Sequence, residues 1–289
     1  MKKAIMNDYL PRLTARVNRE ILSGIEPQRG TLEAAMHYAL AVPGKRLRPL
    51  LFLTLLDACH QDAEKFIGLA SALEIIHTYS LIHDDLPVMD NDDLRRGLPT
   101  VHKQFNEALA LLAGDTLLTF AFEKIAAAPL PAEKTVAIIT IITRCIGKDG
   151  MAQGQALDLE FRGAVQTIAT IHQLKTAELI KGSLLAAAVV ADLGPAQQEL
   201  LARAGIAMGL GFQLADDLLD ITGDEKQVGK KLQKDRSNQS PNAVLYHGVP
   251  AVKTKIDDFY REALALINEL KIDFPPFLVL LENMFFRSN

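Results

Sequence analysis

The sequence predicts an all-α protein, built as a single large bundle of about ten or more helices. Apolar residues recur at spacings of three and four, as at Leu69, Leu73 and Ile76. Aromatic residues make up 6% of the chain and Trp is absent, which argues against a β-rich fold. The sequence shows no alternating apolar–polar run of strand type and no hairpin dipeptide between two such runs.

Clusters of Pro and Gly mark where each helix in turn should end. These breaks fall at residues 27–30, 42–44, 86–87, 97–99, 129–131, 194–195, 237–241, 248–250 and 275–276. Helices are expected in the intervals between them. The run 184–190 is apolar on more than one face, which predicts a helix enclosed by others or a subunit contact. Because no Gly/Ser linker or change of composition separates two halves, we predict one domain over residues 1–289.

Composition excludes several classes of partner and location. The chain carries 31 basic and 35 acidic residues, a formal charge of −4, so no nucleic-acid footprint is expected. The longest uncharged apolar stretches, 182–191 and 205–215, are shorter than the roughly 20 residues of a membrane span. The N-terminal residues lack the apolar core of a secretion signal. Two cysteines, Cys59 and Cys145, are expected to be buried thiols in a reducing compartment, and a cytoplasmic protein without membrane insertion is predicted.

Two acidic clusters carry the predicted chemistry. In the second cluster Asp216 and Asp220 are four residues apart and share one face of a helix. In the first, Asp84 and Asp90 are six apart and would diverge on an ideal helix. Pro87 breaks the helix between them, so the backbone can bring Asp90 back beside Asp84.

Clustered carboxylates repel one another unless cations lie between them. Oxygen ligands without His or Cys at ligand spacing favour Mg²⁺, which bridges a few carboxylates to substrate phosphates. One cluster alone would more often be a solvated helix end, but two clusters embedded in apolar sequence favour a metal site. A calcium loop starting at Asp90 fails, because Arg95 stands where Gly is required.

Basic residues complete the pattern. Lys45, Arg46 and Arg48 gather at a helix start, where diphosphates bind readily. Further cations follow at Arg95-Arg96, Lys175 and Gly229-Lys230. Each of them alone is more often a surface charge. Together with two acidic clusters they indicate two polyanions held beside metal ions.

The motifs resemble those of the trans-isoprenyl diphosphate synthases, most closely the bacterial farnesyl diphosphate synthases (geranyltranstransferases). The resemblance extends from about residue 43 to about residue 267. Its four landmarks are SLIHDDLPVMDNDDLRRGLPTVH (80–102), AQGQALDL (152–159), HQLKT (172–176) and GFQLADDLLDITG (211–223). The resemblance implies an isoprenoid synthase type of bundle around a central apolar cavity, and a homodimer.

It also implies the reaction. Isopentenyl diphosphate is condensed with dimethylallyl or geranyl diphosphate to give farnesyl diphosphate, by Mg²⁺-assisted ionisation and head-to-tail (1′–4) coupling. Three Mg²⁺ are expected, with Mn²⁺ as a substitute. The implied catalytic residues are Asp84, Asp90, Asp216, Arg95, Lys175 and Lys230. The implied metal site comprises Asp84, Asp85, Asp90, Asp216, Asp217 and Asp220.

Substrate binding is implied for further residues. Arg95, Lys175, Thr176, Gln213 and Lys230 would bind at the allylic diphosphate, and Lys45, Arg48, His77 and Arg96 would hold isopentenyl diphosphate. A lone His in an apolar helix is more often structural, but the place of His77 seven residues before Asp84 matches the family's substrate position.

Chain length is expected to depend on Tyr79, with Ser80 beside it. Tyr79 lies five residues before Asp84, about 7.5 Å down the helix. In the family an aromatic residue here stops elongation near fifteen carbons. A ten- or twenty-carbon product remains the nearest alternative, and Tyr79 argues against twenty. Tyr79 could also be a plain core residue.

One segment departs from the family pattern. After Gly229-Lys230 and Asp235, relatives carry Lys-x-Thr-Tyr-Pro, whereas this chain runs from Arg236 to Pro241 without Lys or Tyr before the Pro. Lys234 or Arg236 could substitute for that Lys, and the change bears on lid closure. It is the one feature favouring a non-catalytic partner subunit. A terpene cyclase is disfavoured, because it needs no second diphosphate site.

Overall fold

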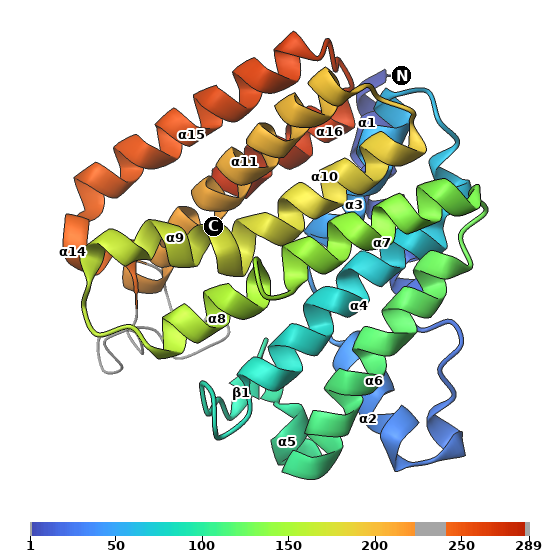
Figure 1. The fold of residues 1–289 in the computed structure, drawn as a ribbon, viewed down its shortest axis with the longest axis vertical. Coiled ribbons are helices and arrows are strands. Elements are labelled where there is room, and N and C mark those ends of the chain that lie inside the picture. The colour runs from blue at the N-terminus through green and yellow to red at the C-terminus, as the bar shows by residue number, and fades with distance from the viewer. Residues whose placement is uncertain (1, 223–240, 287–289) are drawn as a thin grey trace. The chain divides into compact units, whose positions relative to one another are not determined.

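The computed structural model describes residues 2–222 and 241–286, and this part of the chain is helical almost throughout (Figure 1). Its contacts divide the chain into two compact units. The first unit comprises residues 1–53 and 62–131, and the second comprises residues 54–61 and 132–289. The prediction of a single domain over residues 1–289 stays a prediction.

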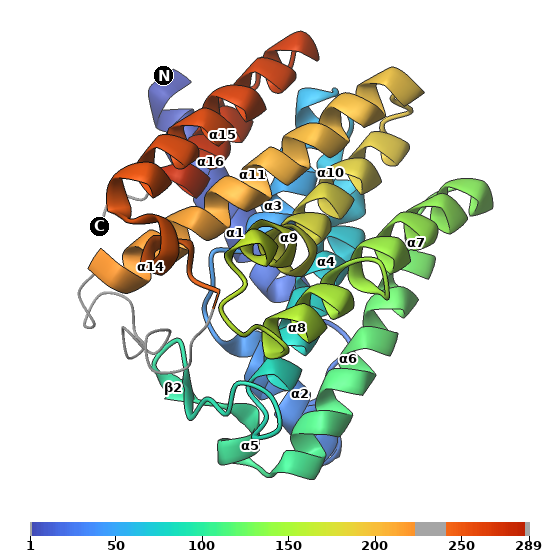
Figure 2. The same cartoon turned by 60° about the vertical axis from the view of Figure 1, so that its left-hand side comes forward.

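The first unit is built around one long buried helix, α4. Its elements are α1 (Lys2–Ile21), η1 (Pro27–Arg29), α2 (Thr31–Ala41), the start of α3 (Leu47–Ala58), η2 (Ala63–Phe66), α4 (Ile67–Asp84), β1 (Leu94–Arg95), β2 (Leu98–Pro99), α5 (Val101–Gln104) and α6 (Glu107–Ala126). Helix α4 lies beside α6 and also contacts α1 and α2 (Figures 1 and 2). Leu69, Leu73, Ile75 and Ile76 are all buried, so nearly its whole circumference is covered by protein.

The same helix is apolar enough to satisfy a membrane-span criterion. The stretch Ala63–Asp84 could cross a bilayer by length and composition, but 61% of its apolar window is buried inside the fold. That burial is typical of a core helix. This stretch contains no long uncharged run, because Glu64, Lys65 and Glu74 interrupt it.

The second unit packs around the longest helix, α11. Its elements are the end of α3, α7 (Ala132–Ile146), α8 (Met151–Leu159), η3 (Val165–Thr167), α9 (Ile168–His172), the π-helical η4 (Gln173–Ala177), α10 (Glu178–Val190), α11 (Pro195–Thr222), α14 (Ala243–His247), α15 (Val249–Glu269) and α16 (Pro275–Phe285). Helix α11 lies between α10 and α15 (Figures 1 and 2). Cys145 is buried as predicted, whereas Cys59 is half-buried.

Two glycines bring α11 unusually close to its neighbours. A Cβ atom at Gly205 would lie 2.6 Å from Cα of Lys181, and one at Gly209 would lie 2.3 Å from Cα of Ala177. These contacts involve backbone, which cannot move aside cheaply. Gly205, Gly209 and Gln213 follow one another at intervals of four, so the same helix face places Gln213 next to η4.

Candidate functional site

The first acidic cluster forms a closed turn at the end of α4. The helix ends at Asp84, and the backbone N–H of Asp90 donates to the carbonyl oxygen of Asp84 at 2.8 Å. The helix therefore ends before Pro87, and the following turn brings the backbone of Asp90 back to that of Asp84, as predicted. Both aspartates are half-buried.

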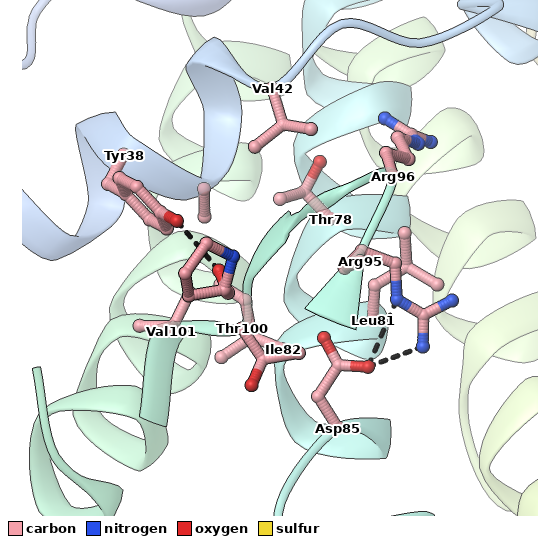
Figure 3. Close-up of a pocket in the computed structure, with 12 residues that line it drawn as sticks. Tyr38, Val42, Thr78, Leu81, Ile82, Asp85, Arg95, Arg96, Thr100 and Val101 are labelled. Carbon is pink, nitrogen blue, oxygen red and sulfur yellow. Dashed lines mark hydrogen bonds and ion pairs between the residues drawn. The ribbon is translucent and has the colours of Figure 1, made fainter. Parts of the chain in front are cut away.

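The neighbouring Asp85 pairs with Arg95. Asp85 is 3% exposed, and the Nε atom of Arg95 donates to its Oδ1 atom at 3.0 Å, with Nη2 of the same guanidinium closer still (Figure 3). Burial raises the pKa of Asp85, and the charge of Arg95 works against that rise. Burial alone would lower the pKa of Arg95, but Asp85, Asp84 and Asp90 raise it overall. All three carboxylates thus act on one guanidinium.

Arg95 belongs to a small hairpin that the sequence did not predict. Strands β1 and β2 are two residues each, with Leu94 opposite Pro99. Arg96 and Gly97 make the turn with positive φ angles of 54° and 80°. Arg96 points away from Asp85 in Figure 3, and its Nη1 atom donates to the carbonyl oxygen of Pro43 at 3.1 Å. The hairpin therefore directs two consecutive arginines to different places.

The basic loop before α3 is held from inside by Arg46. Lys45 is exposed, whereas Arg48 is 7% exposed and Arg46 is 3% exposed with a φ of 49°. The guanidinium of Arg46 donates to the carbonyl oxygens of Leu40 and Val42 at 3.0 and 2.9 Å. Sequence reasoning missed this role, because three cations in four residues resemble a single exposed cluster.

His77 lies among these cations. Its pKa is well below the ordinary value, first because of burial and then because of the positive charges of Arg48, Arg96, Arg95 and Arg46. The ring is therefore neutral at neutral pH. Four guanidinium groups around a neutral imidazole form an environment suited to a polyanion such as a diphosphate.

A small pocket lies between α2, α4 and the hairpin that carries Arg95 and Arg96 (Figure 3). Tyr38 closes one side by donating to the carbonyl oxygen of Pro99 at 2.7 Å, and the Asp85–Arg95 pair closes another. Its volume of about 30 Å³ holds one or two water molecules, whereas a substrate pocket is typically at least tenfold larger.

On α4, Ser80 lies four residues before Asp84, about one turn, and Tyr79 lies five residues before it. The ring of Tyr79 is half-buried and meets the ring of His83 edge-on, with centroids 5.9 Å apart. Burial, with a contribution from Asp84, raises the pKa of Tyr79 to about 12. Ser80 donates to the carbonyl oxygen of His77 at 2.9 Å.

In the second unit Lys175 lies in the π-helical turn η4. Its Nζ atom donates to Oδ2 of Asp158 at 2.5 Å. A Cβ atom at Gly154 would lie 2.3 Å from the backbone nitrogen of Lys175, so only Gly allows α8 to approach this closely. Single π-helical turns are frequent at functional sites. Asp158, on the motif 152–159, is a partner that the sequence did not single out.

The second acidic cluster connects to Thr176 through Gln213. Thr176 Oγ1 donates to Gln213 Oε1 at 2.9 Å, and Gln213 Nε2 donates to Asp217 Oδ1 at 3.0 Å. Helix α11 runs unbroken through Asp220, as predicted. Asp216 is half-buried, whereas Asp217 and Asp220 are 5% and 6% exposed.

Comparison with known proteins shows the family of this chain. The family model "Polyprenyl synthetase" matches residues 29–271. The chain belongs to the polyprenyl synthetase family. A farnesyl diphosphate synthase from Micrococcus luteus is 40% identical over 258 residues, 88% of this chain and 89% of that one. One from Geobacillus stearothermophilus is 42% identical over 238 residues, 80% of each chain.

A solved structure agrees with the fold. The geranyltransferase of Helicobacter pylori, complexed with magnesium and isoprenyl diphosphate, superposes with a TM-score of 0.83 at 32% identity. The match covers 96% of this chain and 95% of that one. The predicted all-α, isoprenoid synthase type of fold is confirmed.

Lys230 and the divergent run up to residue 240 lie outside the described residues. Among the described residues, no three His, Cys, Asp or Glu side chains are grouped as a complete metal site. Mg²⁺ commonly takes one or two carboxylates and fills its remaining positions with water and phosphate oxygens. The oxygen donors Asp84 and Asp90, joined by their backbone turn, are compatible with that ion.

Proposed function

We propose that this protein is a farnesyl diphosphate synthase. It condenses isopentenyl diphosphate with dimethylallyl or geranyl diphosphate by head-to-tail (1′–4) coupling. The observation that carries the proposal is the turn that brings Asp84 and Asp90 together beside Arg95. A metal-bound diphosphate needs carboxylates that ligate the metal ion and a cation that binds the phosphate oxygens. This turn brings both kinds of group together. The farnesyl diphosphate synthases among the relatives support the fifteen-carbon product.

Asp84, Asp90 and Asp216 are the proposed ligands of three Mg²⁺, with Asp85, Asp217 and Asp220 in support, and Mn²⁺ is the expected substitute. When bound, Mg²⁺ would supply positive charge to the leaving diphosphate. Asp85 contributes through Arg95, which it orients toward the other two carboxylates of its cluster. Because Asp85 already fixes the guanidinium of Arg95, less side-chain entropy is lost when a diphosphate binds.

The allylic diphosphate is bound in this proposal by Arg95, Lys175, Gln213 and Lys230, with Thr176 next to Gln213. Asp158 holds the ammonium of Lys175. Negative charge grows on the diphosphate oxygens as the allylic C–O bond breaks, so cations already in place stabilise the transition state more than the ground state.

Isopentenyl diphosphate is bound by Lys45, Arg48, His77 and Arg96. His77 is neutral, since its pKa is lowered by burial and by the arginines around it. A neutral imidazole can donate one hydrogen bond to a phosphate oxygen without adding a further charge. The arginines then supply the charge complementary to the diphosphate.

The coupling step needs no protein nucleophile. The electron pair of the allylic C–O bond leaves with the diphosphate, the double bond of isopentenyl diphosphate attacks the resulting carbon, and one proton passes to the released diphosphate. The task of the chain is to position both substrates and exclude water. An apolar cavity lined by helices is the expected means.

Product length is assigned to Tyr79, with Ser80 beside it. The aromatic ring meets the His83 ring edge-on and lies on α4, five residues before Asp84. In this proposal it blocks further growth of the product chain. Ten- and twenty-carbon products remain the alternatives for the same chemistry.

A homodimer is part of the proposal. Helix α6 exposes Leu111 and Leu112, at 49% and 51%, and such a pair supports burial against a second copy. The absence of membrane insertion and a cytoplasmic location remain predictions.

Product analysis tests the proposed function. The purified protein is incubated with Mg²⁺, isopentenyl diphosphate and each of dimethylallyl, geranyl and farnesyl diphosphate, and the dephosphorylated alcohols are identified by mass. Asp84→Asn serves as the matched control against contaminating enzymes. Farnesol as the end product from the first two substrates supports the proposal, and geranylgeraniol supports the twenty-carbon alternative. Binding without any product would favour the non-catalytic partner suggested by the divergent segment.

A further inference from the structure

The carboxylate of Asp217 is engaged by protein groups on both oxygens. Oδ2 accepts a hydrogen bond from the backbone N–H of Ala243 at 2.7 Å, and Oδ1 accepts one from Gln213 at 3.0 Å. The side chain is 5% exposed. Asp217 is on α11, whereas Ala243 is the first residue of α14. Both oxygens of this buried carboxylate therefore hold groups of the chain itself.

Two neighbours strengthen the same junction. His172 places Nε2 at 3.0 Å from the carbonyl oxygen of Pro241 and at 3.5 Å from Oδ2 of Asp217. Asn242 donates from Nδ2 to the backbone oxygen of Asp217 at 3.2 Å. Its own Oδ1 accepts from the N–H of Val244 at 2.9 Å and so caps α14.

The junction continues into the predicted substrate site. Thr176 donates to the same Gln213 amide whose nitrogen is held by Asp217. Because Thr176 donates to the amide oxygen, the amide nitrogen must find an acceptor elsewhere, and Asp217 provides it. The orientation of Gln213 therefore depends on Asp217.

We infer that Asp217 is a positioning residue, which anchors residues 241–243 to the second acidic cluster and sets the orientation of Gln213 and Thr176. It differs in this from its neighbour Asp216, the proposed metal ligand. The effect on substrate rests on the proposed function, but the anchor itself does not. In the sequence, residues 241–243 directly follow the segment that carries Lys230.

Hydrogen exchange of the metal-free protein tests the anchor directly. Asp217→Ala removes the acceptor of the Ala243 N–H, and amide exchange in residues 242–247 should accelerate by about tenfold or more. Asp217→Asn keeps an oxygen for Ala243. The Gln213 amide can turn over and accept from the new amide nitrogen, so protection should largely return. Asp216→Ala is the matched control, and it should leave exchange at Ala243 unchanged.

A second readout separates positioning from metal binding. Asp217→Ala should raise the KM for the allylic diphosphate by roughly tenfold, and Asp217→Asn, which keeps a hydrogen bond to Gln213 but reverses its amide, should raise the KM less. The Mg²⁺ concentration for half-maximal activity should move less than about threefold in Asp217→Asn, but more than about tenfold in Asp216→Asn.

Two results would overturn the inference. One is unchanged amide exchange at residues 242–247 in Asp217→Ala. The other is an Mg²⁺ dependence in Asp217→Asn that shifts as far as in Asp216→Asn. If Asp217→Ala does not fold, the comparison of Asp217→Asn with Asp216→Asn still decides the question. If the wild-type protein makes no product, the proposed function fails while the metal-free exchange comparison still tests the anchor.

Discussion

Arg46 and Glu74 form an ion pair that is almost completely enclosed by protein. The Nη1 atom of Arg46 lies 3.1 Å from Oε1 of Glu74, and both side chains are 2% exposed. Arg46 also donates from Nε to Asn18 at 2.7 Å and from Nη2 to two backbone carbonyls. One residue thus ties α1, the basic loop and α4 together, although it stands between Lys45 and Leu47 in the sequence.

Removing Arg46 should be strongly destabilising. Arg46→Ala leaves Glu74 buried without its counter-charge, a change that typically costs about 3–5 kcal/mol. The free energy of unfolding from denaturant titration checks the value. Arg16→Ala is the matched control, because the Arg16–Glu64 pair has a similar separation of 2.7 Å but side chains 47% and 40% exposed. Its expected loss is below about 1 kcal/mol, and equal losses in the two variants would contradict the argument.

Gly44→Ala should weaken substrate binding more than stability. A Cβ atom at this position would lie 2.4 Å from Nη1 of Arg96, at the flexible end of that side chain. The guanidinium can move aside at little cost, but it then loses its contact with Pro43 and its place in the cation group.

The KM for isopentenyl diphosphate should therefore rise about 10- to 100-fold in Gly44→Ala, the cost of one charged hydrogen bond. Steady-state kinetics at saturating geranyl diphosphate measures it. Gly30→Ala is the control, since no atom lies within 4 Å of a Cβ atom there. A larger effect on the KM for geranyl diphosphate would place Arg96 in the wrong subsite.

His77 should make the substrate-free protein less stable in mild acid. Its pKa in the folded state is lowered by burial and by Arg48, Arg96, Arg95 and Arg46. Below the unfolded value of about 6.5 the unfolded chain binds the proton and the folded chain does not. The stability is therefore fully present above pH 6.5 and declines as the pH falls below it.

The size of this effect can be isolated by substitution. Between pH 7.5 and 5.5 the wild type should lose about 1 kcal/mol more than His77→Gln, since one pH unit corresponds to about 1.4 kcal/mol. Denaturant unfolding at the two pH values measures the difference. Parallel losses in the two proteins would show that His77 titrates as it does in the unfolded chain.

The helices were predictable because their signals are local. The 3.6-residue periodicity and the Pro/Gly breaks locate the starts of α11 and α15, and Pro87 locates the end of α4 near Asp84. The return of Asp90 to Asp84 also followed from residues close together in the chain.

The unpredicted features depend on contacts between distant residues or on very short elements. Strands of two residues in the 94–99 hairpin are too short for any alternation. Arg46 reads as one more surface cation until Glu74, 28 residues later, covers it. Asp217 reads as part of an acidic helix face, and its partner Ala243 lies 26 residues further on. Nothing in a local pattern distinguishes Asp217 from Asp216.

Tyr79→Ala should lengthen the product. The aromatic side chain fills space on α4 and rests against the ring of His83, so its removal opens room where a growing chain would extend. With geranyl diphosphate and isopentenyl diphosphate, the variant should make geranylgeraniol or longer alcohols after dephosphorylation, measured by mass. Tyr79→Phe keeps the ring and loses only a hydroxyl whose pKa of about 12 leaves it protonated, so it should still stop at fifteen carbons. If Tyr79→Ala also stops there, Tyr79 is a core residue and another side chain sets the length.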